Sequence, residues 1–536
     1  MAATTKNSLV FRSAITASLG GLLFGFDTAV ISGVTDSLQR VFSLDDAQLG
    51  IAVSSALVGT ILGAATIQYP ANRFGRKPTL LFIALLYLIS AIGSAFPWNI
   101  SSFIFFRFLG GIGVGGASVV SPLYTAEISP AKRRGFLVAL TQFNIVLGIL
   151  LAYVSNFIIA GFDLGEAEWR WMLGIEAIPA LIFFILLLGN PESPRWLMSK
   201  GRNTEAAQLF RKLTGSEEAA QEEYVAVEKA LQEELSTGKE SLFCWRFRKP
   251  IFLAICIAAF NQLSGVNAIL YYAPKVFLMA GASPSMSMFF PTIIGLTNFV
   301  ATLLAILVID SFGRKTLMYI GSWGYIVSLG LVGALFGIYA DAFNSQIQAI
   351  EEQAVVVVER DVENSVAESE ENITSPADSQ TVDNYSSNGE KDSIPSVTEK
   401  KGIPKFVVLG VLVGLMVFIS AHALGQGACI WVFLSEIFPN GVRAQGQALG
   451  SLVHWLLAAL VSGTFPPRSL PSAPRRLAFG SFSFRHIPAV TWSPGTFKSL
   501  HFIHGIHDIA VDLGQVCHAG DETDLIGKYP EESWND

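Results

Sequence analysis

One acidic side chain near the start of the sequence could carry a proton. Asp27 lies in the middle of an apolar, glycine-rich segment, residues 20–33. If that segment crosses a bilayer, a charged Asp near its centre costs on the order of 2.5–3.5 kcal/mol, so it must face a polar cavity, be protonated or find a partner. Arg107, in a second apolar segment, is the nearest candidate partner, because an unpaired buried Arg is equally costly. The two residues predict a proton switch, a lock between two helices, or both.

The elements that must position this pair are membrane-spanning helices. The chain has 536 residues, of which 51% are hydrophobic and 15% charged, and its mean hydropathy is +0.47. Soluble domains carry about 25% charged residues, so the composition predicts an integral membrane protein. A spanning helix needs about 20 mostly apolar residues. The sequence offers eleven such segments: 13–34, 47–69, 78–97, 101–125, 136–160, 170–189, 250–274, 287–310, 316–340, 404–434 and 445–466.

The short connections between these segments indicate the orientation. Lys and Arg gather after the second, fourth and eighth predicted helices, within 73–77, 132–134 and 314–315, and are almost absent from the first, third and fifth connections. The positive-inside rule therefore places the N-terminus and the basic loops in the cytoplasm of a multi-pass protein in the cell membrane.

An internal repeat divides the chain into two halves. NRFGRK at 72–77 recurs as DSFGRK at 310–315, and EISP at 127–130 recurs as EIFP at 436–439. Two parallel six-helix halves joined by a polar loop form the architecture of the major facilitator superfamily. The predicted domains are an N-terminal six-helix bundle at 1–189, a helical cytoplasmic linker at 190–249 and a C-terminal bundle of helices seven to eleven at 250–467. An acidic, disordered external insertion is expected at 341–403, within the C-terminal bundle. An atypical polar tail follows at 468–536.

The end of the sequence departs from this plan. After Pro467 no apolar run of about 20 residues remains for a twelfth helix. The tail is rich in Ser, Pro and Arg and holds five of the seven histidines, without the Cys or carboxylate spacing of a metal site. An altered reading frame or a replaced C-terminus would explain the abrupt change of composition.

Several motifs follow one another in a specific order. They are GGLLFGFD at 20–27, RFGRK at 73–77, Arg107 followed by glycines 110, 111, 113 and 115, PESPRW at 191–196, NQLSGVN at 261–267 and SEIFP at 435–439. Together they resemble the sugar porter family of the major facilitator superfamily, most nearly its xylose/proton symporter branch and more distantly the facilitative glucose transporters. The resemblance covers about residues 1–467 apart from the insertion. It implies an all-α polytopic membrane protein of two pseudo-symmetric six-helix bundles, with the twelfth helix missing or replaced.

The resemblance also implies a proton-coupling site. In the similar symporters, residues matching Asp27, Arg107 and Glu176 form it. A nearby guanidinium favours the charged carboxylate and an apolar surrounding favours the neutral acid, so rocking of the halves could alternate proton release and uptake. For Glu176, a hydrogen bond that only packs two helices is the alternative.

Basic loop residues face acidic residues at the predicted helix ends. The resemblance implies a cytoplasmic latch of the outward-open state, with Arg76 and Arg134 paired to Glu192, and with Arg314 and Arg443 paired to Glu436. Orientation through the positive-inside rule alone would also explain the basic residues. The full predicted gating network is Arg76, Glu127, Arg134, Glu192, Arg314, Glu436 and Arg443.

Amides and aromatic rings in the predicted helices suit a sugar, because sugar hydroxyls need groups that donate and accept, and pyranose faces stack on rings. A lone membrane Gln or Asn can instead hold two helices together. The chain departs from the family at Asn261, where a Gln is frequent, at Ile149, where xylose symporters have Gln, and at Gln426, where a Trp is frequent, so the sugar stays undetermined. The resemblance places the sugar site at Gln142, Gln262, Asn267, Tyr271, Asn298, Gln426 and Trp455.

The sequence therefore predicts a transporter, and not an enzyme, that moves a hexose or pentose by alternating access and couples it to protons through Asp27. The expected partners are the monosaccharide, protons and the lipid bilayer, with no cofactor, metal or nucleic acid, and the protein is expected to be monomeric. The alternatives are a facilitative uniporter, a sugar sensor that does not transport, and a defective product that lacks its last helix.

Overall fold

A computed structural model describes residues 2–131, 133–236, 241–343, 345, 403–439 and 442–465. Within these residues the chain is helical and contains no strand. Eleven of its helical segments are long and apolar enough to cross a membrane, which confirms the predicted number. The segments are Leu9–Gly33, Asp46–Thr66, Arg76–Ala95, Ile100–Ile128, Arg134–Ala160, Gly165–Leu188, Trp245–Tyr271, Pro284–Ile309, Arg314–Ile338, Lys405–Leu434 and Gln445–Thr464.

The first half packs its helices around α6. Helix α6 lies against α1, α3 and α5, while α1 also packs on α7 and α5 on α9. Close contact depends on glycine: a Cβ on Gly111 of α6 would overlap the carbonyl oxygen of Ala56 of α3. The helices are α1 (Ala2–Val30), α2 (Thr35–Val41), α3 (Asp46–Thr66), α4 (Gln68–Phe74), α5 (Arg76–Ala95), α6 (Ile100–Ile128), α7 (Arg134–Ala160), α8 (Glu168–Gly174) and α9 (Ala177–Leu188).

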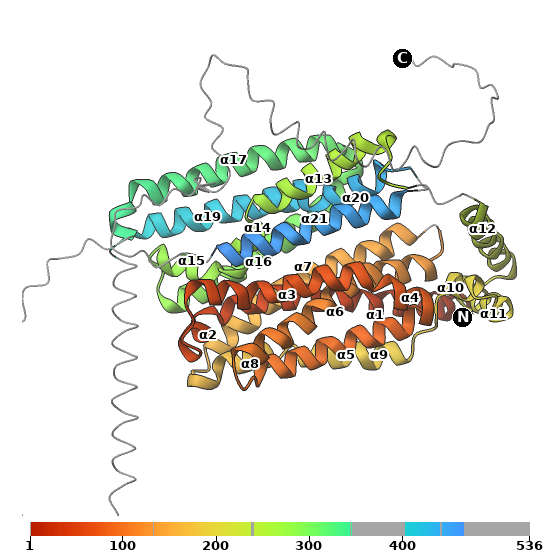
Figure 1. Cartoon of the computed structure of the whole chain (residues 1–536), viewed down its shortest axis with the longest axis horizontal. Coiled ribbons are helices and arrows are strands. Elements are labelled where there is room, and N and C mark those ends of the chain that lie inside the picture. The colour runs from red at the N-terminus through yellow and green to blue at the C-terminus, as the bar shows by residue number, and fades with distance from the viewer. Residues whose placement is uncertain are drawn as a thin grey trace, which may run out of the picture.

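Short helices follow the first half, as the composition of the predicted linker indicates. They lie at one end of the molecule, beyond the long helices (Figure 1). Helix α11 has Leu209, Phe210 and Leu213 buried on one side and ends at Gly215, whose φ of +86° suits a residue without a side chain. The helices are α10 (Pro194–Ser199), α11 (Asn203–Thr214) and α12 (Glu217–Ser236).

The second half forms a second layer of long helices beside the first (Figure 1). Two of its predicted spans are less regular than their hydropathy indicates. The seventh is broken at Gly265, whose φ is +83°, and again at Tyr272 before Pro274. The tenth contains a π-helix, η4 (Ala423–Gly427), next to α19 (Lys405–His422). The other elements are the 3-10 turn η3 (Trp245–Phe247), α13 (Arg248–Leu263), α14 (Val266–Tyr271), α15 (Ala273–Met279), α16 (Pro284–Phe312), α17 (Arg314–Ile338), α20 (Ala428–Glu436) and α21 (Arg443–Thr464).

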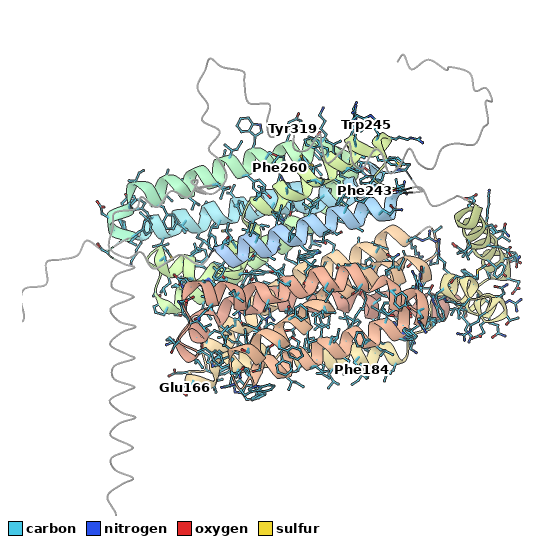
Figure 2. The ribbon with its side chains drawn as sticks, viewed as in Figure 1. Glu166, Phe184, Phe243, Trp245, Phe260 and Tyr319 are labelled. Atoms are coloured by element: carbon cyan, nitrogen blue, oxygen red, sulfur yellow. The ribbon has the colours of Figure 1, made fainter. Side chains whose placement is uncertain are left out.

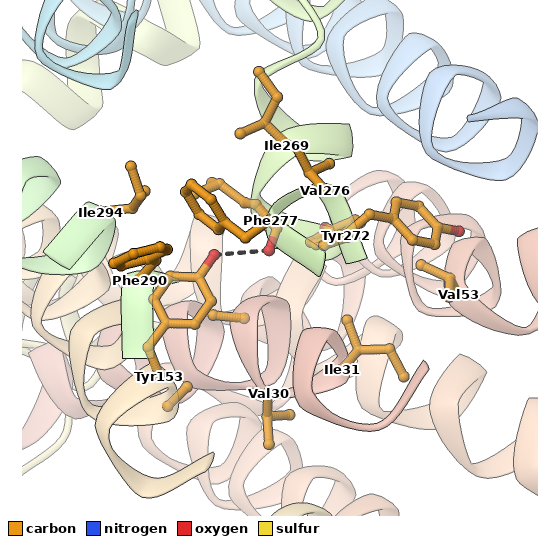
Figure 3. Packing of buried hydrophobic residues seen from close by; sticks show 14 of the residues in the cluster. Val30, Ile31, Val53, Tyr153, Ile269, Tyr272, Val276, Phe277, Phe290 and Ile294 are labelled. Carbon is orange, nitrogen blue, oxygen red and sulfur yellow. Dashed lines mark hydrogen bonds between the residues drawn. The ribbon is translucent and has the colours of Figure 1, made fainter. Parts of the chain in front are cut away.

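The main apolar core is shared by the halves. Tyr153 and Val30 of the first half pack in one cluster with Phe277 and Phe290 of the second (Figure 3). The predicted tail at 468–536 and the absent twelfth helix lie outside the described residues. So does the predicted insertion, except for residues 341–343, 345 and 403.

Candidate functional site

Asp27 of α1 and Arg107 of α6 form a buried ion pair. Arg107 Nη1 donates to Oδ1 of Asp27, and Nη2 donates to the backbone carbonyl of Asp27 at 3.1 Å. Each side chain is 2% exposed. Gly110, one turn further along α6, lets α5 pack closely here, since a Cβ on it would overlap the Ser90 hydroxyl. Removing one partner of such a pair typically costs about 3–5 kcal/mol, so the two charges depend on each other.

Glu176 is the second buried acid of this region. It lies between α8 and α9 and is 2% exposed. Asp27 and Arg107 both act on it electrostatically, yet its Oε1 has no hydrogen-bond partner in the part of the chain that is described. A buried carboxylate without a partner is costly unless it binds a proton or gains a partner in another arrangement. The geometry is thus suited to proton exchange.

Tyr87 of α5 belongs to the same buried group, and the sequence analysis missed it. Its side chain is fully buried, and its hydroxyl has no hydrogen-bond partner among the described residues. Asp27 and Glu176 both lie within electrostatic range of it. A phenol can donate and accept a hydrogen bond, so Tyr87 can serve both carboxyl groups.

A small pocket beside the ion pair is shared by the two halves. The second half contributes Tyr271 of α14 and Trp455 of α21. The Trp455 ring also packs on Phe24 of α1, with centroids 5.6 Å apart. The pocket therefore brings together the predicted proton-coupling pair and two of the predicted sugar-binding residues. The first half lines it with Asp27, Thr28, Ile31, Val53, Ala56, Leu57, Thr60, Arg107 and Val114.

Gln262 of α13 is the centre of a buried polar cluster. Its amide nitrogen donates to Asn261 Oδ1 at 2.8 Å, and its oxygen accepts from Asn267 Nδ2 at 2.7 Å. The same nitrogen lies 3.1 Å from His454 Nε2 on α21. The His454 ring packs on Trp455, with centroids 4.8 Å apart. These groups satisfy one another here and could exchange those bonds for sugar hydroxyls.

His454 was not among the predicted site residues. The available signal was a polar residue within an apolar span, directly before Trp455.

Three predicted sugar-binding residues belong neither to the pocket nor to the cluster around Gln262. Gln142 and Asn298 lie beside a ring contact between α7 and α16, in which Phe143 and Phe299 have centroids 5.4 Å apart. Gln426 lies in the π-helix and is 8% exposed, and its Oε1 has no partner among the described residues. Helical segments of this rare type often occur at functional sites.

A hydrogen bond joins the halves where the seventh span is broken. The Tyr153 hydroxyl of α7 donates to the carbonyl oxygen of Leu270 at 2.7 Å (Figure 3). Nearby, Lys275 Nζ donates to Gln39 Oε1 at 3.1 Å, and Gln39 Nε2 donates to Asp46 Oδ1 at 3.2 Å. None of these contacts was predicted. The signal for the first was Pro274, which lies four residues after Leu270 and has no N–H to offer it.

The predicted partner of Arg76 is wrong. Its guanidinium pairs with Glu127, with Nε 2.8 Å from Oε2 and Nη2 2.9 Å from Oε1. Glu192 instead accepts the backbone N–H groups of Arg76 at 2.9 Å, Lys77 at 3.3 Å and Ser193 at 2.7 Å. The start of α5 has unpaired N–H groups that a carboxylate can cap. Gly75, with φ of +112°, leaves room for Glu192. Burial raises the pKa of Glu192, and these hydrogen bonds offset part of the rise.

The other predicted pairs are met only in part. Arg134 lies 3.8 Å from Glu223 of α12 instead of pairing with Glu192. Arg314 pairs with Glu436 at 3.1 Å, as predicted. Arg443 donates to the carbonyl of Phe438 at 3.3 Å and is not paired with Glu436. Each of the three ion pairs formed by Arg76, Arg134 and Arg314 lies within one half or links one half to the linker.

The described residues contain no group of three or more His, Cys, Asp or Glu side chains that could hold a metal ion. The buried ion pair, the shared pocket and the polar cluster all lie between membrane-spanning helices. This arrangement is that of a polytopic membrane transporter built from two helical halves.

The sequence model of the family described as "Sugar (and other) transporter" matches residues 13–357 and 394–475. The D-xylose-proton symporter of Escherichia coli (strain K12) is 34% identical over 491 residues, 86% of each chain. The arabinose-proton symporter of Bacillus subtilis is 32% identical over 475 residues, 88% of each chain. The glucose transport protein of Synechocystis is 34% identical over 465 residues, 84% of this chain and 86% of that protein. The chain belongs to this family of the major facilitator superfamily and is a sugar transporter, not an enzyme.

Solved structures agree with this assignment. The xylose transporter of E. coli in a partially occluded inward open conformation superposes with a TM-score of 0.63 at 32% identity, covering 86% of this chain and 92% of that one. The inward open conformation of the same transporter superposes with a TM-score of 0.63 at 33% identity, covering 85% of this chain and 90% of that one. The predicted fold is confirmed.

Proposed function

We propose that the protein is a proton-coupled symporter of a monosaccharide that works by alternating access. The observation that carries the proposal is the pocket in which the Asp27–Arg107 pair meets Tyr271 and Trp455. A proton taken up by Asp27 and a sugar bound at Tyr271 would share one space. The names of the E. coli and B. subtilis relatives, both proton symporters, support the same reading.

Proton coupling would use the two states of Asp27. The charged carboxylate binds Arg107 and holds α1 to α6. A proton on Asp27 would weaken that bond and free the guanidinium, which Glu176 could then receive. Because α1 also packs on α7 and contacts α14, a change in the ion pair would be felt at the interface between the halves. Tyr87 would position the two carboxyl groups.

Sugar binding would use the polar cluster around Gln262. Tyr271 and Trp455 would provide ring faces, and Gln262, Asn267 and His454 would bond the hydroxyls. Gln142, Asn298 and Gln426 would complete the site when the halves move closer, since Gln142 and Asn298 already lie beside the contact between α7 and α16.

The proposal also includes the orientation and oligomeric state of the transporter. The N-terminus and α10–α12 lie in the cytoplasm, and the protein acts as a monomer in the plasma or inner membrane. Tyr153–Leu270 and Lys275–Gln39 close the outer end, so this conformation faces inward. The pairs Arg76–Glu127, Arg134–Glu223 and Arg314–Glu436, with Glu192 capping α5, brace the cytoplasmic helix ends within each half in this conformation and would regroup into a latch between the halves in the outward-open state. The two bundles, 1–189 and 250–467, rock about the shared pocket.

A panel of labelled sugars tests the proposal. The full chain in proteoliposomes, with an inward proton gradient, should accumulate one or more of xylose, arabinose and glucose, and a protonophore should abolish accumulation while leaving exchange intact. Uptake that is concentrative and insensitive to the protonophore would contradict proton coupling. Uptake that only equilibrates the sugar, with or without the gradient, would indicate a uniporter.

A further inference from the structure

A short basic and aromatic segment, residues 241–252, enters the seventh span and is held firmly by the second half. Leu242 is 2% and Phe247 4% exposed, and both pack in a cluster with residues of α13 and α20. The backbone N–H of Leu242 donates to Gln445 Oε1 of α21 at 3.0 Å. The backbone of this segment is therefore fixed, and so is the direction of its outward side chains.

Three aromatic side chains of the segment point outward. Phe243 is 59%, Trp245 67% and Phe252 66% exposed, and the first two lie at the end of the molecule where α20 ends (Figure 2). Trp245 is the first residue of its membrane span. Tryptophan at the end of a span favours the boundary between head groups and acyl chains.

Three exposed cations accompany these rings, with no acidic residue between 241 and 252. They are Arg246, Arg248 and Lys249. The Arg248 guanidinium lies 4.0 Å from the centroid of the Trp245 ring, and that of Arg246 lies 5.7 Å from the Phe247 ring. None of the three has a carboxylate partner within the described ranges. In contrast, Arg76, Arg134 and Arg314 all do. These cations remain available to an external anion.

The exposed side of α13 carries a cation at its start and apolar side chains further along the helix. Arg248, Phe252 and Ile255 follow the i, i+4, i+7 spacing of one side of α13, and Ile255 is 38% exposed. A ligand that fits must have an anionic head against the cations and an apolar chain along Phe252 and Ile255. Guanidinium groups bind phosphate oxygens in a bidentate manner. A free anion without an acyl chain would make no contact with Phe252 and Ile255.

We propose that Arg246, Arg248 and Lys249, with Trp245 and Phe243 at the membrane boundary, bind the phosphate head group of an anionic glycerophospholipid at the start of α13. This site is separate from the pocket that contains Asp27 and does not depend on proton coupling. Because α13 carries Gln262, the bound lipid would anchor the helix on which the polar cluster is built.

Native mass spectrometry of the purified full chain tests this site. Phosphatidylglycerol should bind more tightly than phosphatidylcholine, and the triple variant Arg246→Gln, Arg248→Gln, Lys249→Gln should bind phosphatidylglycerol about ten-fold or more weakly. The control is Arg202→Gln, Arg211→Gln, Lys212→Gln at the two ends of α11, which also removes three exposed cations, two of them paired with Glu205 and Glu217, and should bind as the unmodified chain does. If the triple variant does not fold, Arg248→Gln alone should weaken binding.

Equal affinity for the two lipids would overturn the proposal. So would an unchanged affinity in the triple variant or an equal loss in the control. Inorganic phosphate that displaces the lipid at similar concentration would show a simple anion site and would also overturn it. Phosphatidylglycerol should raise the thermal unfolding midpoint of the unmodified chain and not that of the triple variant, since a ligand stabilises only the form that binds it.

Discussion

The hydroxyl of Tyr153 lies 2.7 Å from the carbonyl oxygen of Leu270 and takes the place of a missing helical N–H. Pro274 leaves that carbonyl without its donor four residues on, and the donor comes from the other half of the protein. The bond can form only when the halves are close at this end. A local defect in the seventh span therefore stabilises one conformation of the whole transporter.

Tyr153→Phe should shift the protein away from this conformation. Without the hydroxyl, the buried Leu270 carbonyl has no partner while the halves are closed at this end. The missing hydrogen bond destabilises the closed state by about 1–3 kcal/mol. The population of that state should fall by about ten-fold or more. Spin labels attached to cysteines introduced at the exposed positions Asp36 and Ser285, in a background without the native cysteines, should show longer distances by double electron–electron resonance. Tyr69→Phe, on an exposed tyrosine, should leave the distances unchanged.

Tyr87→Phe should impair coupling more than binding. Removing the hydroxyl takes away a group close to both Asp27 and Glu176 that could donate to either carboxyl when the proton moves, while Arg107 still donates to Asp27. Sugar exchange between equal concentrations should stay within about two-fold of the unmodified rate, whereas accumulation driven by a proton gradient should fall by about ten-fold. The pH profile of accumulation should also move. Tyr319→Phe on the exposed face of α17 is the control, and equal losses in both assays would show a structural role only.

His454→Ala should weaken sugar binding. The bound sugar would lose the hydrogen bond proposed from His454, and a buried hydroxyl left without a partner costs about 1–3 kcal/mol, which corresponds to a rise of about ten-fold in the apparent Kd. His454→Gln restores a donor and an acceptor and should recover most of the affinity. Measurement of sugar binding by calorimetry for both variants tests this account. If Ala and Gln behave alike, the His454 ring acts through packing on Trp455 and not through its hydrogen bond.

Glu192 should give the chain a defined pH dependence of stability. Burial raises the pKa of the folded group above its ordinary value of 4.5. Between these two values the folded state binds more protons than the unfolded state, so the free energy of unfolding should decrease as pH rises through that window. Glu192→Gln removes this term. Thermal unfolding midpoints from pH 4 to pH 8 should therefore fall less steeply in the variant, and parallel curves would contradict the assignment.

The sequence was informative where one residue type decides the outcome. Hydropathy located eleven spans, and the cost of an unpaired buried charge led from Asp27 to Arg107. The sequence was not sufficient where several acidic residues could pair with the same arginine. Glu127 and Glu192 are both acids near Arg76, and only the three-dimensional arrangement shows that Glu127 takes the guanidinium while Glu192 caps the α5 backbone. Charge pattern alone does not distinguish a side-chain pair from a backbone cap.

The breaks in the seventh span illustrate the same limit. The hydropathy of 250–274 is that of one helix, and the effects of Gly265 and Pro274 depend on their neighbours. Gly265 adopts a left-handed conformation, whereas other glycines, such as Gly111, serve to bring two helices together. The role of His454 depends on Gln262, which lies 192 residues away in the sequence.

Proton movement on sugar addition shows whether Asp27 couples sugar entry to protons. The full chain in proteoliposomes with a transported sugar added outside should make the external medium more alkaline. Asp27→Asn should abolish this signal while sugar exchange continues, and Asp36→Asn, on an exposed acid of α2, should leave it intact. Sugar entry without alkalinisation in the unmodified protein, or undiminished alkalinisation in Asp27→Asn, would contradict proton coupling through Asp27.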